Sequence, residues 1–115
     1  MAPRTRIMYI ENKGNNGIVG PARIGRVTIL NRGKSLRYRE QRFASLDGRG
    51  FKSNYCDLDS GDYYWISGCR KDGGDALYST SVEIDEDVRE EYWKEIRRQP
   101  ENTKAGFVKE TGKNR

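Results

Sequence analysis

The stretch "YYWI", Tyr63 to Ile66, constrains the fold more than any other part of this sequence. In a strand, neighbouring side chains point to opposite faces. Tyr63 and Trp65 would therefore share one face, and Tyr64 and Ile66 the other. Because such a strand is apolar on both sides, the fold must either cover both faces or leave one of them to bind a partner.

The rest of the sequence predicts several short strands. Glycine, asparagine and aspartate clusters separate short extended segments, which is typical of an antiparallel β domain. In the first segment, Ile7 and Tyr9 point one way and Met8 and Ile10 the other. We expect extended segments at 5–11, 23–30, 34–40, around Phe43 and Leu46, and at 51–58, 63–68 and 77–84.

One amphipathic helix is predicted near the end of the chain, at about 85–98. Asp85 is a good N-cap residue, because its side-chain oxygen can accept a hydrogen bond from an unpaired backbone N–H group. Pro100 ends the helix. Its apolar face consists of Val88, Tyr92, Trp93 and Ile96.

These elements predict a mainly β fold: a small, strongly bent antiparallel sheet or open barrel, with the C-terminal amphipathic helix packed on it. A chain of 115 residues is the size of one domain. We assign residues 1–99 to this domain. We expect residues 100–115, which have few apolar side chains, to be a disordered polar tail.

The helix is the expected cover for one face of 63–66. Burying a large aromatic side chain stabilises a fold by roughly 1.5–3 kcal/mol, so mutual burial of these two apolar surfaces is the default. Aromatic side chains that the helix leaves exposed would anchor a protein partner. The candidate partner-binding residues are Tyr63, Tyr64 and Trp65.

Charge is distributed unevenly along the chain. Residues 1–50 contain 11 Lys and Arg against 3 Asp and Glu, whereas residues 51–100 contain 7 against 12. The basic part binds an external anion, faces solvent, or pairs with the acidic helix. Because arginine binds phosphates and Tyr38 could stack on a base, the basic hairpin 23–42 is a candidate nucleic-acid site. Its candidate residues are Arg23, Arg26, Arg32, Lys34, Arg37, Arg39 and Arg42.

Catalytic and metal-binding motifs are not supported. The chain has no histidine, which removes histidine-based catalysis and the commonest metal ligand. The turn "DLDSGD", 57–62, lacks the glycine and closing glutamate of a calcium loop, and a hairpin turn explains it better. Cys56 and Cys69 are expected to be free thiols, with Cys69 the better candidate for a reactive one because Arg70 follows it. We expect neither a cofactor nor a metal, and no enzyme activity.

The sequence suggests a cytoplasmic protein. No apolar run approaches the roughly 18 residues of a membrane span. The N-terminus lacks the uninterrupted apolar region of a secretory signal.

Five stretches carry a resemblance to a known family: "RIMYIENKG", "GPARIGRV", "YYWISG", "KDGGDALY" and "VEIDEDVREEYW". Together they cover most of residues 6–93, and they resemble a family of short bacterial proteins, about 110 residues long, whose function is unknown. Such proteins sometimes carry the name of the enzyme deoxyxylulose-phosphate synthase. The chain is far too short for that thiamine-diphosphate enzyme and lacks its Gly-Asp-Gly metal motif, so the resemblance implies no catalytic residues.

The sequence therefore favours a non-catalytic binding module. A protein is the leading partner, and nucleic acid bound through the hairpin 23–42 is the alternative.

Overall fold

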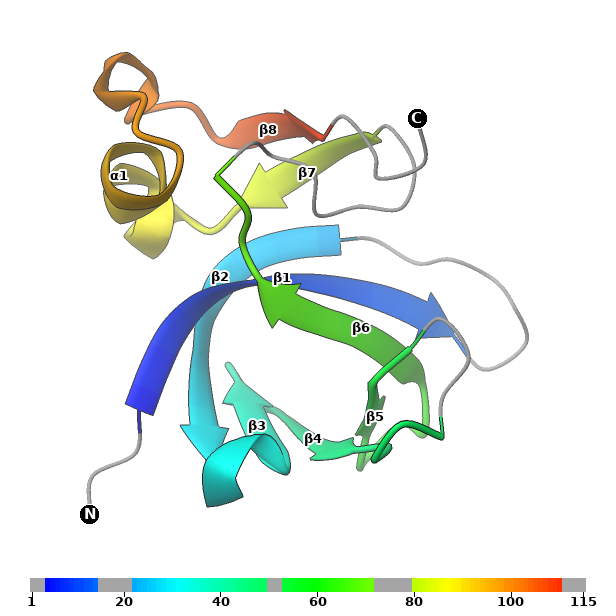
Figure 1. Ribbon diagram of the computed structural model, residues 1–115. Helices are drawn as coiled ribbons and strands as arrows, with labels where there is room; N and C mark the ends of the chain where they lie inside the picture. The colour runs from blue at the N-terminus through cyan, green and yellow to red at the C-terminus, as the bar shows by residue number, and fades with distance from the viewer. Residues whose placement is uncertain (1–3, 15–21, 50–52, 72–79, 111–115) are drawn as a thin grey trace.

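The computed structural model describes residues 4–14, 22–49, 53–71 and 80–110. Six of its strands form a closed antiparallel barrel, which confirms the predicted fold class. The barrel closes because β1 is long and curved and pairs with both β2 and β6 (Figure 1). The barrel strands are β1 (Arg4–Gly14), β2 (Ala22–Leu30), β3 (Ser35–Tyr38), β4 (Gln41–Ser45), β5 (Tyr55–Asp57) and β6 (Tyr63–Gly68).

A second layer covers the outside of β1 and β2. Strand β7 (Thr80–Ile84) runs parallel to β2, and β8 (Phe107–Glu110) pairs antiparallel with β7. Between these two strands the chain forms one short helical segment, 86–96, at the upper left of Figure 1. The helical segment consists of a 3-10 turn (Glu86–Val88), the α-helical turn α1 (Arg89–Glu91) and a π-helical turn (Tyr92–Ile96).

The molecule has two hydrophobic cores, which meet at the wall formed by β1 and β2. The alternation of side chains along β1 sends Met8 and Ile10 into the barrel, and Ile7 and Tyr9 outward under the second layer. The barrel core contains Met8, Ile10, Val27, Leu36, Tyr38, Phe43, Tyr64 and Ile66. The outer core contains Ile7, Tyr9, Ile24, Val82, Ile84, Val88, Tyr92, Trp93 and Val108.

The two faces of β6 are covered by different parts of the fold. Tyr64 and Ile66 are buried in the barrel core, where the Tyr64 ring packs edge-on against Phe43 at 4.8 Å between centroids. Trp65, on the other face, is half-buried against the outer core. Tyr63 is 43% exposed. The barrel interior therefore covers one face of 63–66, and the second layer covers only part of the other.

The helical segment differs from the predicted helix. Its last helical residue is Ile96, earlier than expected, and Pro100 starts a separate 3-10 turn, Pro100–Asn102. Asp85 occupies the N-cap position but makes no side-chain capping hydrogen bond. The reason is that its carboxylate is used in tertiary contacts with the barrel, which are described below.

The prediction of a disordered tail beginning at residue 100 is wrong for residues 100–110. Strand β8 pairs with β7, and Val108 is only 3% exposed. The indole Nε1 of Trp93 donates a hydrogen bond to the carbonyl oxygen of Ala105 at 3.0 Å, and the amide of Ile84 donates to that of Gly106 at 2.8 Å. These contacts outweigh the low apolar content of the segment. Residues 111–115 lie outside the described ranges.

Candidate functional site

Two arginines of the predicted nucleic-acid site converge on a buried carboxylate. Asp85 is only 3% exposed. Its Oδ1 accepts a hydrogen bond from Arg23 Nε at 2.9 Å, and it lies 2.9 Å from Arg39 Nη2. Tyr38 donates its hydroxyl hydrogen bond to Asp85 Oδ2 at 2.5 Å. We call Arg23, Tyr38, Arg39 and Asp85 the Asp85 cluster, and it ties the start of the helical segment to β2 and β3.

The Asp85 cluster shifts the protonation of its members. Burial and the hydrogen bond to Asp85 together raise the pKa of Tyr38 to about 12. Burial opposes the charged form of Arg23, but its hydrogen bonds to Asp85 and Tyr38 prevail, so the pKa of Arg23 is raised. Arg23 remains a permanent cation and Tyr38 a neutral donor at physiological pH, which suits a structural linkage.

Glycine at position 25 is required by this cluster. A Cβ atom built on Gly25 would lie 2.3 Å from Asp85 Oδ2 and 2.6 Å from Tyr38 Cε1, which is far inside normal contact distance. The β1–β2 register runs through this glycine without a break, with Met8 opposite Gly25.

Two further arginines of the hairpin form ion pairs at the surface. Arg26 Nη2 lies 2.7 Å from Glu91 Oε1, and Arg42 Nη2 lies 3.0 Å from Asp59 Oδ1. Arg23 also contacts Glu83 at 2.9 Å. Much of the basic hairpin therefore neutralises the acidic part of its own chain.

Three cations of the predicted nucleic-acid site are not neutralised by an ion pair among the described residues. They are exposed, and within the described residues they form no ion pair. Two lie at the β2–β3 turn, whereas Arg37 lies on β3 opposite Thr28 of β2 and Arg42 of β4. The three residues are Arg32, Lys34 and Arg37.

Beside Arg37, the outside of β4, β5 and β6 forms an exposed sheet face. The strand registers place Ala44 opposite Cys56, and Cys56 opposite Tyr63, in one row. Leu58 follows β5 and is 57% exposed, and its amide donates a hydrogen bond to the carbonyl oxygen of Arg42 at 2.9 Å. We call this surface the outer barrel face; it consists of Arg37, Arg42, Ala44, Cys56, Leu58 and Tyr63.

The structure separates the three predicted partner-binding aromatics. Tyr63 lies on the outer barrel face, Tyr64 lies inside the barrel, and Trp65 lies against the outer core. Only Tyr63 is available to a partner as a largely exposed ring. Leu58 has no distinguishing motif in the sequence, although its spacing of two from Cys56 places both on one face of an extended strand.

The turn 57–62 has a structural role. Asp57 is 5% exposed, and its carboxylate accepts hydrogen bonds from the backbone amides of Asp59 and Ser60 and from the Gln41 side chain. These hydrogen bonds outweigh the effect of burial, so the pKa of Asp57 is lowered. The aspartate is held as an anion that shapes the hairpin.

Within the described ranges, no group of three or more cysteines, aspartates or glutamates is arranged to hold a metal ion. No helix in the part of the chain that the structure describes is long and apolar enough to cross a membrane.

Comparisons with models of known protein families, with curated proteins and with solved structures found no match to this chain. The resemblance to a family of short bacterial proteins therefore stays a prediction.

Proposed function

We propose that this protein is a non-catalytic binding module that docks a protein partner on its outer barrel face. The observation that carries the proposal is the position of Tyr63 and Leu58, two large apolar side chains that remain 43% and 57% exposed on one face of the barrel. Tyrosine and arginine are enriched among residues that dominate binding energy at interfaces. On this face Tyr63 supplies the ring, and Arg37 and Arg42 supply the cations.

Charge complementarity indicates the kind of partner. Arg37 forms no ion pair within the described residues, and Arg42 shares its charge only with the exposed Asp59. A partner with an apolar centre and acidic residues beside it would bury Tyr63 and Leu58 while pairing with these arginines.

A nucleic acid fits this surface less well. Phosphate binding favours a continuous basic patch. Here Arg23 and Arg39 are bound to Asp85, and the exposed carboxylates of Asp47 and Asp59 flank the outer barrel face. The three exposed cations at 32, 34 and 37 keep nucleic acid as the second candidate.

The cytoplasm is the compartment we propose for this interaction. Cys56 and Cys69 are not joined in a disulfide, which fits a reducing environment.

The test is quantitative affinity capture from a lysate of the source cell with tagged protein. We expect the Tyr63→Ala/Leu58→Ala double variant to lose at least tenfold of the specifically captured partner, because a hot-spot residue commonly contributes more than about 1.4 kcal/mol. Arg37→Glu should also weaken capture, because it places a like charge opposite an acidic partner.

Phe107→Ala is the matched control, since Phe107 is 61% exposed on β8, away from the outer barrel face. It should leave capture unchanged. Nuclease treatment before capture separates the two partner classes. Capture that disappears with nuclease, or that is indifferent to the double variant, would exclude protein docking on this face.

A further inference from the structure

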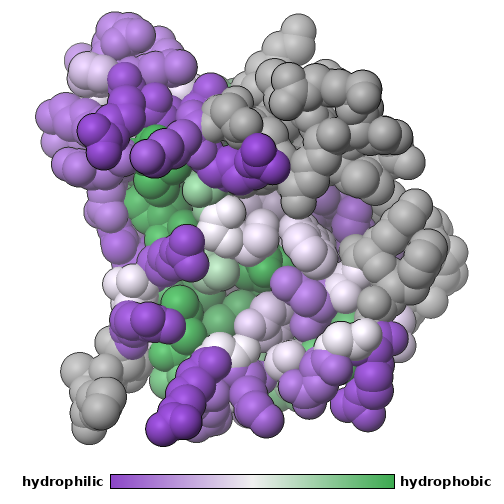
Figure 2. Space-filling model, in the orientation of Figure 1, coloured by the Kyte–Doolittle hydropathy of each residue, from purple (hydrophilic) through white to green (hydrophobic). Residues whose placement is uncertain are grey.

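A separate pocket of about 260 Å³ lies where the helical segment meets the barrel. Strand β1 supplies Thr5, Arg6 and Ile7, and the chain just after β6 supplies Cys69. The opposite wall comes from Arg26 of β2 and from Glu91 and Ile96 of the helical segment. On the left of Figure 2, apolar side chains surface between the hydrophilic side chains of the helical segment and those of the barrel.

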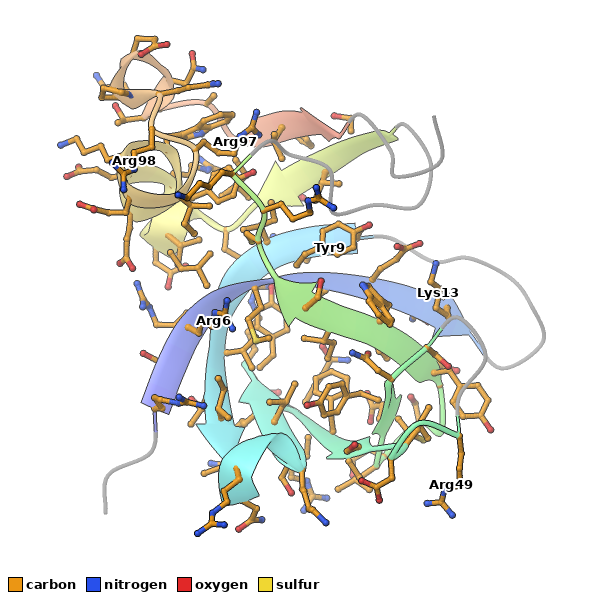
Figure 3. The ribbon with its side chains drawn as sticks, in the orientation of Figure 1. Arg6, Tyr9, Lys13, Arg49, Arg97 and Arg98 are labelled. Atoms are coloured by element: carbon orange, nitrogen blue, oxygen red, sulfur yellow. The ribbon has the colours of Figure 1, made fainter. Side chains whose placement is uncertain are left out.

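Arg6 is the charged group that this pocket does not neutralise. Among the described residues it forms no ion pair and no hydrogen bond, whereas Arg26 is held by Glu91 at 2.7 Å. The Arg6 guanidinium lies directly over Gly68: a Cβ atom there would be 2.3 Å from Arg6 Nη2. Figure 3 shows Arg6 on β1, below the helical segment. The glycine thus makes room for the arginine beside the pocket.

The charges and walls of the pocket define its ligand. With Arg26 paired to Glu91, the lining carries one net positive charge. One positive charge matches a monoanion better than a phosphate dianion, and a guanidinium can bind a carboxylate through two parallel hydrogen bonds. Ile96 is half-buried and supplies an accessible apolar side chain to the lining, whereas Ile7 is only 4% exposed and most of the accessible lining is polar.

We propose that this pocket binds a small aliphatic carboxylate, with the carboxylate on Arg6 and the hydrocarbon chain against Ile96. The volume of the pocket equals that of about nine water molecules at roughly 30 Å³ each. This accommodates a chain of about six carbons and is below the usual size for a drug-sized ligand. The site lies on the β1 side of the barrel and is independent of the outer barrel face.

Titration with sodium hexanoate, followed by amide chemical shifts in NMR spectra at constant ionic strength, tests the proposal. We expect saturable shifts at Ile7, Gly68 and Cys69. Butanoate should bind more weakly, by roughly fourfold for each buried methylene removed. Hexylamine, which carries the opposite charge on a chain of the same length, should produce no saturable shift.

Two variants test the role of Arg6. Arg6→Gln should weaken hexanoate binding at least tenfold, and Gly68→Ala should weaken it by displacing the Arg6 guanidinium. Arg49→Gln is the matched control: it removes the same charge from an exposed arginine at the opposite end of the barrel (Figure 3). Absence of saturable shifts with hexanoate would overturn the proposal. So would equal binding of hexylamine, or hexanoate affinity unchanged in Arg6→Gln.

Discussion

At the scale of single residues, Asp85 has the most contacts that depend on its charge. Its carboxylate accepts hydrogen bonds from the Tyr38 hydroxyl and the Arg23 guanidinium and forms an ion pair with Arg39, while only 3% of the residue is exposed. Its contacts are costly to break because the carboxylate and the Tyr38 hydroxyl are buried, whereas the side chains of Arg23 and Arg39 remain 31% and 58% exposed. The stability of the second layer therefore depends on this one side chain.

We expect Asp85→Asn to lower the free energy of unfolding by about 2 kcal/mol, because a neutral amide would make weaker hydrogen bonds with Arg23 and Tyr38 than the carboxylate does. Urea unfolding followed by tryptophan fluorescence measures the change. Asp87→Asn removes the same charge two residues later, from an exposed position, and should cost under about 0.5 kcal/mol. Equal losses for the two variants would contradict a structural role for the Asp85 cluster.

Tyr38 makes the stability depend on alkaline pH. Its folded pKa of about 12 lies above the value of 10.0 expected in the unfolded chain. The stabilisation is therefore fully present below pH 10 and is lost as the pH rises from 10 through 12. It is on the order of 3 kcal/mol, from about 1.4 kcal/mol for each of the two pKa units.

This dependence is measured by comparing the unfolding free energies of the wild-type protein and Tyr38→Phe at several pH values between 8 and 12. The variant should be less stable below pH 10, and the difference should shrink toward pH 12. A difference that stays constant across that range would show that Tyr38 ionises equally easily in the folded and unfolded states.

At the scale of elements, β8 shows how tertiary contacts can order a polar segment. Its sequence has no strong strand pattern of its own, but β7 offers an open edge and the outer core has room for one more apolar side chain. Val108 fills that room, and Phe107 beside it remains 61% exposed.

The difference in burial between Val108 and Phe107 predicts a large loss of stability for one substitution and a small one for the other. Val108→Ala should lower the free energy of unfolding by about 2 kcal/mol, because it removes buried methyl groups and leaves a cavity. Phe107→Ala should change it by less than about 0.5 kcal/mol, although it removes more atoms. Thermal and urea unfolding of both variants provide the test, and a larger loss for Phe107→Ala would show that β8 is oriented the other way.

The elements that the sequence predicted correctly are those whose pattern is local. The alternation in β1 placed Ile7 and Tyr9 on one face and Met8 on the other, and the double apolar face of 63–66 required two covers, as found. Features that depend on contacts between residues far apart in the sequence could not be predicted from local patterns. Asp85 resembled an N-cap because nothing in its neighbours along the chain reveals Tyr38 and Arg23.

The candidate sites also combine features that are visible in the local sequence with features that only tertiary contacts determine. Seven cations in the hairpin 23–42 were visible in the sequence, but their pairing with carboxylates up to 65 positions away was not. Arg6 had no distinguishing pattern, because its importance comes from Gly68, which β-pairing places beside it. Leu58 lies in the turn 57–62, whose aspartates resemble part of a calcium loop. That pattern does not indicate that the leucine side chain is exposed.

At the scale of the whole molecule, the two cores share the wall of β1 and β2. Ile7, Tyr9 and Ile24 face the second layer, while Met8, Ile10 and Val27 face the barrel interior. Strand β1 has no solvent-facing side along its buried stretch, which runs from Ile7 to Glu11. Packing changes on one side of this wall are therefore transmitted to the other through the same strand.

The shared wall also gives the chain an order of assembly during synthesis. All six barrel strands precede residue 69, so the barrel can close while the residues of β7, the helical segment and β8 are still inside the ribosome. Until those residues emerge, Ile7, Tyr9 and Ile24 form an uncovered apolar strip on the nascent chain. For that interval the unfinished protein presents the kind of surface that chaperones recognise, and the second layer removes it when it folds.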